Sequence, residues 1–202
     1  MTKILTALST SLDGFIAGAD DSPDQPLGTG GAPLFNWLRN GDTPSRHNPA
    51  FRLSPLSATF FDEGIDQCGA VVGGRRTYDV SRAWGGAGPI PGLPLFVLTH
   101  RVPADVPAGE PAYTFVTDGI DSAVEQARGA ANGKHVFLMG ADAVQQCLRA
   151  GLLDEIIINL VPVLVGRGVR LLDHLDQPTP MLECTRVVDA PSVTHLTYRV
   201  IN

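Results

Sequence analysis

Short apolar segments bounded by turn residues are the feature that most constrains how this chain folds. Residues 70–72, Leu95–Leu98 and His135–Met139 are each too short for a buried helix, and helical patterns lie between and after them. Apolar runs of this length that alternate with helices are typical of buried strands in a largely parallel sheet. We therefore expect an α/β fold whose mixed, mostly parallel sheet is flanked by helices.

The two ends of the chain add further strands to this sheet. Residues 3–9 suit a first strand, and residues 156–161 suit one long enough to cross the sheet. Residues 181–188 and 193–201 are two more, joined by a short turn, which predicts an antiparallel C-terminal pair. No linker or internal repeat divides the chain, so we expect residues 1–202 to form a single domain.

The connecting segments differ in character. Residues 57–67 suit a helix, and Asp118 is a candidate N-cap for another. Residues 18–56 are rich in Gly, Pro, Asp and Ser and contain one short helical piece near residues 34–38. A loop of this length in a compact domain is usually functional, so we expect it to lie near a ligand.

Composition excludes several classes of protein. Hydrophobic residues make up 44% and charged residues 18%, which excludes a disordered chain. The net charge of −6 argues against binding of a nucleic-acid backbone. No run of eighteen apolar residues predicts a membrane span, and no signal peptide is evident, so we expect a cytoplasmic protein that acts on a small molecule.

The cysteines give no sign of a disulfide framework or a metal site. Cys68, Cys147 and Cys184 are widely spaced and form neither a CxxC pair nor a cluster with histidine. We expect all three to be small buried hydrophobic residues, and we expect no bound metal.

Three strand ends carry residues suited to binding phosphate. Glycines let a backbone approach a ligand closely, helix starts offer free N–H groups, and ligands of α/β sheets bind beyond the carboxyl ends of strands. The alternative is a solvated helix start or an exposed loop cation at each place. The GxGxxG, GxxxxGK[ST] and GxSxG fingerprints are absent. The candidate residues are Gly74, Arg75, Arg76 and Thr77; Thr99, His100 and Arg101; and Gly140, Ala141, Asp142, Ala143 and Val144.

Four stretches in this order resemble the dihydrofolate reductase-like superfamily. They are SLDGFIA at residues 11–17, VGGRRTY at 72–78, LTHR at 98–101, and a tail from 139 to 172 that contains AGLLDE and PVLVGRG. Together they cover residues 9–172. The chain is most similar to stand-alone proteins that resemble the C-terminal reductase domain of the bifunctional riboflavin-biosynthesis deaminase-reductase.

The resemblance implies a dihydrofolate-reductase-like fold and an NADPH-dependent oxidoreductase. Such enzymes transfer hydride to a C=N or C=O bond of a small heterocyclic or carbonyl substrate. It also implies a homodimer, for which residues 156–165 and the C-terminal strands offer sheet edges. By resemblance, residues 74–77 hold the pyrophosphate and adenosine, residues 99–101 the 2′-phosphate, and residues 140–144 complete the phosphate cradle. Ala7, Ile16 and Gly18 would line the nicotinamide.

The substrate positions depart from the family pattern. Dihydrofolate reductases carry a pterin-binding carboxylate where this chain has Ala58, although Asp62 and Glu63 lie one turn later. The riboflavin-pathway reductase carries a substrate-binding glutamate where this chain has Met139. Neither familiar substrate can therefore be carried over.

Few residues are candidates for catalysis or substrate binding. Asp13 could bind substrate or relay a proton, but an Asp-Gly turn residue often bonds only its own backbone. Trp37 and Phe61 could stack on a flat substrate, or belong to the core. We assign no role to His195 or to the other histidines. Two alternatives to the reductase stay open: a non-catalytic dinucleotide- or nucleotide-binding protein, and a weak dihydrofolate reductase.

Overall fold

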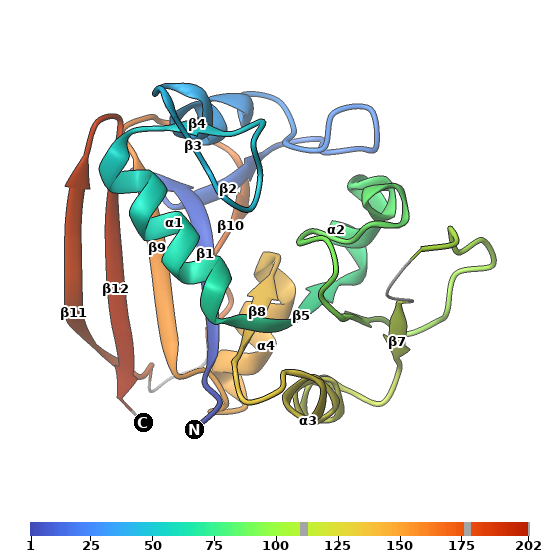
Figure 1. Cartoon of the computed structure of the whole chain (residues 1–202). Coiled ribbons are helices and arrows are strands. Elements are labelled where there is room, and N and C mark those ends of the chain that lie inside the picture. Colours follow the sequence, from blue (N-terminus) through green and yellow to red (C-terminus); the bar gives the residue numbers. More distant parts are fainter. Residues whose placement is uncertain (110–112, 176–178, 202) are drawn as a thin grey trace.

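One mixed sheet organises the molecule, whose computed structural model describes residues 1–109, 113–175 and 179–201 (Figure 1). Eight strands follow the spatial order β11-β12-β9-β1-β8-β5-β6-β7. Their bounds are β1 Ile4–Ser11, β5 Cys68–Gly74, β6 Leu95–Leu98, β7 Thr114–Val116, β8 His135–Met139, β9 Glu155–Val161, β11 Met181–Ala190 and β12 Val193–Ile201.

The pairing of these strands confirms the predicted fold class. Neighbours from β9 through β1, β8, β5 and β6 to β7 are parallel, whereas β12 pairs antiparallel with both β9 and β11. The short turn between β11 and β12 contains Pro191 and Ser192, with Ser192 at φ +69°. The C-terminal pair is therefore antiparallel, as its connection predicted.

Helices cover the two faces of the sheet unequally. Helices α3 (Ile120–Ala130) and α4 (Ala141–Arg149) pack on one face of the β5–β8 region, where Val136 and Leu138 are buried. Helix α1 (Pro55–Gln67) crosses β1, β9 and β12 on the other face (Figure 1). The hydroxyl of its N-cap Ser54 accepts from the Ser57 amide, and a proline at the first position suits the helix start.

The sheet divides between β1 and β8, and this division creates room for a site. The two strands pair only from Ile4 to Thr6 on β1, whereas β1 stays paired with β9 as far as Ser11. Beyond Thr6 and Leu138, β1 and β8 separate at their carboxyl ends. A crevice of this kind is where α/β sheets bind ligands.

The long segment after β2 (Phe15–Gly18) is more ordered than its composition suggested. It contains the 3₁₀ helix η1 (Ala32–Arg39) and a small antiparallel pair, β3 (Thr43–Pro44) with β4 (Arg52–Leu53). Strand β2 itself pairs with β10 (Gly168–Arg170). The short helix α2 (Arg75–Val80) follows β5 and faces the loop after β2 (Figure 1).

Three sequence expectations are corrected. Strand β9 lies between β1 and β12, so it offers no sheet edge; β11 is the edge strand at this end of the sheet. Cys184 is exposed because it lies on that edge strand, whereas Cys68 and Cys147 are buried. Helix α3 begins at Ile120, with Gly119 at φ +106° as its N-cap in place of Asp118.

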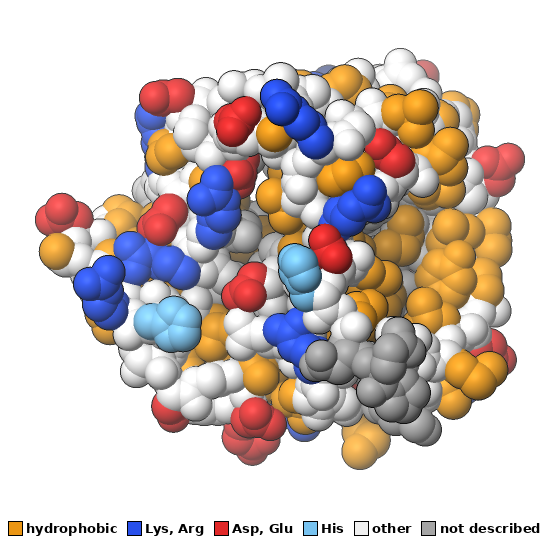
Figure 2. All heavy atoms as spheres, turned by 180° about the vertical axis from the view of Figure 1, so that it is seen from behind, with side chains coloured by type: hydrophobic (Ala, Val, Ile, Leu, Met, Phe, Trp, Pro, Cys, Tyr) orange, Lys and Arg blue, Asp and Glu red, His pale blue; other side chains and the backbone are white. Residues whose placement is uncertain are grey.

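The outer half of the sheet keeps one uncovered apolar face. Leu182 and Val187 on β11 pair with Val200 and Leu196 on β12, and both β11 residues are exposed. Figure 2 shows hydrophobic side chains gathered on this side of the molecule. Within the described ranges, no helix is long and apolar enough to cross a membrane, and no group of three or more His, Cys, Asp or Glu side chains is placed to hold a metal ion.

The buried face of β8 provides a test of the core. Leu138 is 2% exposed and packs among residues of the main hydrophobic cluster. Leu138→Ala should lower the free energy of unfolding by about 2–5 kcal/mol, because it removes buried methyl groups and leaves a cavity. Urea denaturation measures the loss. Leu164→Ala is the control, since Leu164 is 74% exposed and should change stability by less than about 0.5 kcal/mol.

Candidate active site

A single cleft of about 1520 Å³ runs from the carboxyl ends of β5–β8 to the space beneath α1. We call the first part the glycine–arginine half; its residues are Gly74–Thr77, Thr99–Arg101, Thr117, Gly119 and Gly140–Asp142. We call the second part the aromatic half; its residues include Phe35, Trp37, Phe51, Phe60, Phe61, Glu63, Asp66, Asn159, Arg186 and Thr197. Ala7 of β1 and Met139 of β8 line the cleft where the two strands separate.

The structure brings most of the predicted phosphate and nicotinamide residues into this cleft. The predicted residues that line it are Ala7, Ile16, Gly74, Arg75, Arg76, Thr77, Thr99, His100, Arg101, Gly140, Ala141 and Asp142. Three others do not. Ala143 and Val144 are fully buried because they lie on the inward face of α4, and a Cβ on Gly18 would come within 1.8 Å of the Thr29 carbonyl oxygen.

Gly140 fixes how closely β8 approaches α2. Its φ of +92° favours glycine, and a Cβ there would lie 2.2 Å from the Thr77 hydroxyl oxygen. The Val144 amide is the first in α4 to reach an acceptor, the Gly140 carbonyl at 3.3 Å. The preceding amides at the helix start therefore have no intrahelical acceptor. They face a cleft that also receives the Asp142 carboxylate, which accepts from Gln146 at 2.8 Å.

The arginines of this half differ in how they are held. Arg75 pairs with Asp79 and donates to the Arg101 carbonyl at 2.9 Å. Arg76 pairs with Asp21 of the loop after β2, which raises the pKa of the guanidinium. The side chain of Arg101 makes no hydrogen bond or ion pair with any residue in the described ranges. Arg101 is therefore the guanidinium of this half that is available to a ligand.

The aromatic half is built on a tryptophan. Trp37 of η1 is 4% exposed and donates its ring N–H to the Ser9 hydroxyl at 2.9 Å. Its ring packs edge-on against Phe61 and His195, with centroids 6.4 and 5.2 Å away. Both predicted stacking residues, Trp37 and Phe61, line the cleft. They also pack in the second hydrophobic cluster, as the core alternative predicted, and their stacking on a substrate stays a prediction.

A buried polar chain lies beside these rings and links α1 to the sheet. The Ser57 hydroxyl lies 3.0 Å from Nε2 of His195, and Nδ1 of His195 lies 2.8 Å from Oδ1 of Asn159. One assignment satisfies all buried hydrogens: Ser57 donates to Nε2, and Nδ1–H donates to Asn159. The reverse assignment would leave the Ser57 hydroxyl hydrogen without an acceptor among the described residues.

His195 is neutral in this chain. It is fully buried, stacks on Phe60 at 4.4 Å, and takes up no position on the cleft surface. Burial, with a smaller contribution from the charge of Arg186, lowers its pKa to about 4. A neutral ring keeps the single tautomer that fixes the orientation of Asn159.

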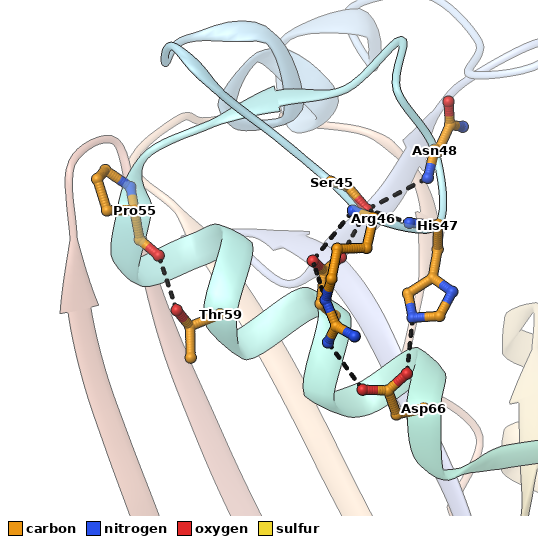
Figure 3. A network of polar contacts seen from close by, with 8 residues as sticks. Ser45, Arg46, His47, Asn48, Pro55, Thr59 and Asp66 are labelled. Atoms are coloured by element: carbon orange, nitrogen blue, oxygen red, sulfur yellow. Dashed lines mark hydrogen bonds and ion pairs between the residues drawn. The ribbon is translucent and has the colours of Figure 1, made fainter.

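The carboxylates of α1 are already engaged. Asp62 is 5% exposed and accepts from the Ser45 hydroxyl at 2.6 Å and from the Arg46 amide at 3.1 Å. Figure 3 shows the 45–48 loop held against the helix, with Arg46 reaching on to Asp66. Glu63 pairs with Arg186 of β11 at 3.0 Å. Asp62 is thus committed to the loop, and Ala58 is a core residue.

Asp13 serves as an anchor for a neighbouring loop. Its carboxylate accepts from Ser11 at 2.6 Å and from the amides of Val165 and Gly166 at 3.1 and 2.7 Å. The hydrogen bond from Ser11 and those from the two amides outweigh desolvation and lower its pKa to about 2. Asp13 is not among the residues that line the cleft, so the geometry gives no support to its predicted catalytic and substrate-binding role.

Several cleft residues were missed from the sequence. Thr117 and Gly119 lie at the end of β7, where the strand–glycine–helix pattern seen at Gly140 is repeated and could have been used. Asp21 lies in a loop without periodicity. Asn159 of β9 and its partner His195 of β12 lie opposite each other on neighbouring strands. Only the register of these two strands reveals that they meet.

The sequence matches the family of the RibD C-terminal domain over residues 2–196. The chain belongs to this family. No curated protein matches it at a significant level.

Solved structures support the same fold for this RibD C-terminal domain protein. A putative riboflavin biosynthesis protein from Shewanella sp. PV-4 has 24% identity and a TM-score of 0.71, with both chains covered completely. Dihydrofolate reductase from Enterococcus faecalis, solved with NADP(H) and RAB-propyl, has 14% identity and a TM-score of 0.55, with 99% of this chain and 97% of that one covered.

A bifunctional relative is longer than this chain. The diaminohydroxyphosphoribosylaminopyrimidine deaminase/5-amino-6-(5-phosphoribosylamino)uracil reductase from Thermotoga maritima has 14% identity and a TM-score of 0.60. The match covers 98% of this chain and 56% of that one. This chain therefore corresponds to part of that protein.

Asp62 makes the stability of the α1 region depend on pH. Burial raises its pKa, but the hydrogen bonds from Ser45 and Arg46 and the charge of Arg46 prevail and lower it. Its stabilising effect is therefore present above its unfolded pKa of about 4 and is lost as the pH falls through the lower folded value. Asp62→Asn should cost on the order of 1–2 kcal/mol at pH 7, and less at pH 3.

Urea denaturation of the unmodified protein and of Asp62→Asn, each at pH 7 and pH 3, measures the cost of the substitution at both pH values. Asp66→Asn is the matched control, because Asp66 contacts the same Arg46 but its side chain is 42% exposed. It should cost less than Asp62→Asn at pH 7. An equal cost of Asp62→Asn at pH 7 and pH 3 would contradict the assignment.

Proposed function

We propose that this protein is an NADPH-dependent reductase that transfers hydride to a C=N or C=O bond of a small heterocyclic or carbonyl substrate. The observation that carries the proposal is the continuity of the cleft. The glycine–arginine half, the β1 residue Ala7 and the aromatic half all open into one space of about 1520 Å³. A cofactor and a flat substrate can therefore occupy neighbouring positions, as hydride transfer requires.

The residues of the glycine–arginine half fit a phosphorylated dinucleotide. Gly140 leaves a space that a Cβ would fill, and the free amides at the start of α4 suit an anion. Arg101 and the Thr99 hydroxyl lie together at the end of β6, where the Arg101 amide donates to Thr99 at 3.3 Å. We assign the 2′-phosphate to this strand end because an arginine beside the ribose accommodates that group.

NADPH would supply the hydride, and the residues of this chain would hold and orient the two reactants. Trp37 and Phe61 would limit water and align the substrate ring. Asp13 is ionised at neutral pH, so it does not serve as a proton donor there. We propose that a water molecule in the cleft supplies the proton, because the redox chemistry belongs to the cofactor.

Reduction of dihydrofolate is disfavoured by the α1 contacts. Ala58 stands where a pterin-binding carboxylate would be, and it packs in the second hydrophobic cluster. Asp62 cannot replace that carboxylate without breaking its bonds to Ser45 and Arg46. We therefore expect no measurable NADPH oxidation with dihydrofolate.

Arg101→Ala tests the cofactor assignment. The substitution should weaken NADPH binding about tenfold or more and leave NADH binding nearly unchanged, since only NADPH carries the 2′-phosphate. Titration of both nucleotides by ligand fluorescence measures the two affinities. Arg167→Ala is the matched control, because Arg167 is an exposed arginine outside the cleft.

Equal losses for NADPH and NADH would remove Arg101 from the 2′-phosphate site. No binding of either nucleotide to the unmodified protein would overturn the reductase proposal. Binding of NADPH without oxidation in the presence of carbonyl and imine compounds would favour the non-catalytic alternative.

We also propose a homodimer formed through the edge strand β11. Glu183 and Arg186 lie on one face of β11, because a bulge separates them, whereas Leu182 and Val187 lie on the other. Antiparallel pairing of two copies with Glu183 opposite Arg186 also places Leu182 opposite Val187. The same pairing is repeated by the two-fold axis, so the strand is complementary to itself in charge and in apolar surface.

Sedimentation equilibrium tests this assembly. The unmodified protein should sediment as a dimer, and Val187→Lys should shift it to a monomer by placing an unpaired ammonium group against Leu182 of the second copy. Leu12→Lys is the control, because Leu12 is 67% exposed at a site distant from β11 in the sheet order. A monomeric unmodified protein at micromolar concentration would contradict the proposal.

A further inference from the structure

Among the residues that the structure describes, the aromatic half has no cation that is free to bind phosphate. Within the described ranges, the arginine that lines it is Arg186, whose guanidinium pairs with Glu63 at 3.0 Å. The same guanidinium lies over the ring of Phe60, 4.9 Å from its centre. Arg101, the unpaired arginine of the cleft, lies at the other end, beyond β6.

Carboxylates add to this contrast. Glu63 and Asp66 of α1 both line the aromatic half. Both are already paired, Glu63 with Arg186 and Asp66 with Arg46, so a phosphate placed here would have to displace Glu63 from Arg186 to gain a partner. Like charges brought together in a partly enclosed cleft are strongly disfavoured. The charge arrangement therefore selects against a phosphorylated substrate.

The shape of the aromatic half suits a flat ring. Trp37 is held by its bond to Ser9, and Phe61 packs against it on one side and against Phe51 on the other, with centroids 5.7 Å apart in the second pair. Rings fixed by packing present rigid apolar walls at low entropic cost. A planar molecule can lie against such walls with little rearrangement.

Asn159 offers a hydrogen-bond donor beside these rings. Its Oδ1 accepts from Nδ1 of the fully buried His195, which directs the amide nitrogen away from that ring. The nitrogen has no acceptor among the described residues, and Asn159 lines the cleft. A fixed N–H donor beside rigid rings specifies a ligand that presents an acceptor at its edge.

We propose that the substrate is an uncharged planar molecule without a phosphate group, whose carbonyl oxygen or ring nitrogen accepts a hydrogen bond from the Asn159 amide. That this ligand is a substrate rests on the proposed reductase function. The binding site itself does not depend on NADPH. His195 and Ser57 act as positioning residues, because they hold the amide without touching the ligand.

Two matched pairs of compounds test the charge preference by calorimetric titration of the protein without cofactor. The first pair is 5-amino-6-(5-phosphoribosylamino)uracil and its dephosphorylated form. The second pair is flavin mononucleotide and riboflavin. In at least one pair the uncharged compound should bind at least about tenfold more tightly than its phosphorylated partner. Failure of both uncharged compounds to bind, or tighter binding of the phosphorylated ones, overturns the proposal.

Asn159→Asp tests the donor. The aspartate keeps an acceptor for His195 but offers no N–H to a ligand, so the uncharged compound should bind about tenfold or more weakly. Asn40→Asp makes the same chemical change where Asn40 donates to Ser192 outside the cleft, and it should leave the affinity unchanged. Unchanged affinity in Asn159→Asp, with an unchanged melting temperature, overturns the assignment.

Glu63→Gln tests the charge argument without touching Asn159. It releases Arg186, so the phosphorylated compounds should bind about tenfold more tightly than they bind the unmodified protein. Glu125→Gln is the matched control, because Glu125 is an exposed glutamate of α3 that does not line the cleft. No gain in Glu63→Gln overturns the claim that the paired Arg186 is what excludes phosphate.

A separate NADPH titration keeps the two proposals distinguishable. If the unmodified protein binds riboflavin or the dephosphorylated compound but not NADPH, the reductase proposal is refuted and the proposal of an uncharged planar ligand is supported. NADPH binding with a preference for the phosphorylated compounds would support the cofactor site and refute the ligand class.

Discussion

The early separation of β1 from β8 is the constraint on which the rest of the structure depends. Only three residue pairs join these parallel strands, ending at Thr6 and Leu138, although both strands continue beyond that point. The Thr6 hydroxyl donates to the Leu138 carbonyl at 3.1 Å, at the last pair. Beyond it, the carboxyl ends of β5–β8 diverge from those of β1 and β9. The glycine–arginine half therefore belongs to one part of the sheet and the aromatic half to the other.

Helix α1 is held over the second part by polar contacts at both of its faces. Ser57 bonds to His195 on the side of the sheet, and Asp62 bonds to the 45–48 loop on the opposite side. A buried polar group is costly unless it is bonded, so these contacts tolerate few alternative positions of the helix. The neutral state of His195 follows from the same burial, and it gives Asn159 a single orientation.

The sequence predicted the features that depend on local signals. Short apolar runs located β5, β6 and β8, and the residues at their carboxyl ends include Gly140 and Arg101, which line the cleft. Features that depend on pairing between distant segments were not predicted. His195 and Asn159 meet only through strand register, and Cys184 is exposed only because β11 is an edge. Asp62 is a candidate carboxylate from the sequence only because it lies one turn after Ala58. Its bonds to Ser45 and Arg46 could not be predicted, because the 45–48 loop has no regular spacing.

The separation of the cleft into two halves has a consequence for how such a protein can diverge. The glycine–arginine half is fixed by backbone geometry, as the contact between Gly140 and Thr77 shows, so few substitutions are tolerated there. The aromatic half is assembled mainly from side chains of η1 and α1 and of the segment between them. Those side chains can change without altering the strands that carry the first half. A lineage with this architecture can therefore exchange one reaction partner for another while the other binding function is inherited intact.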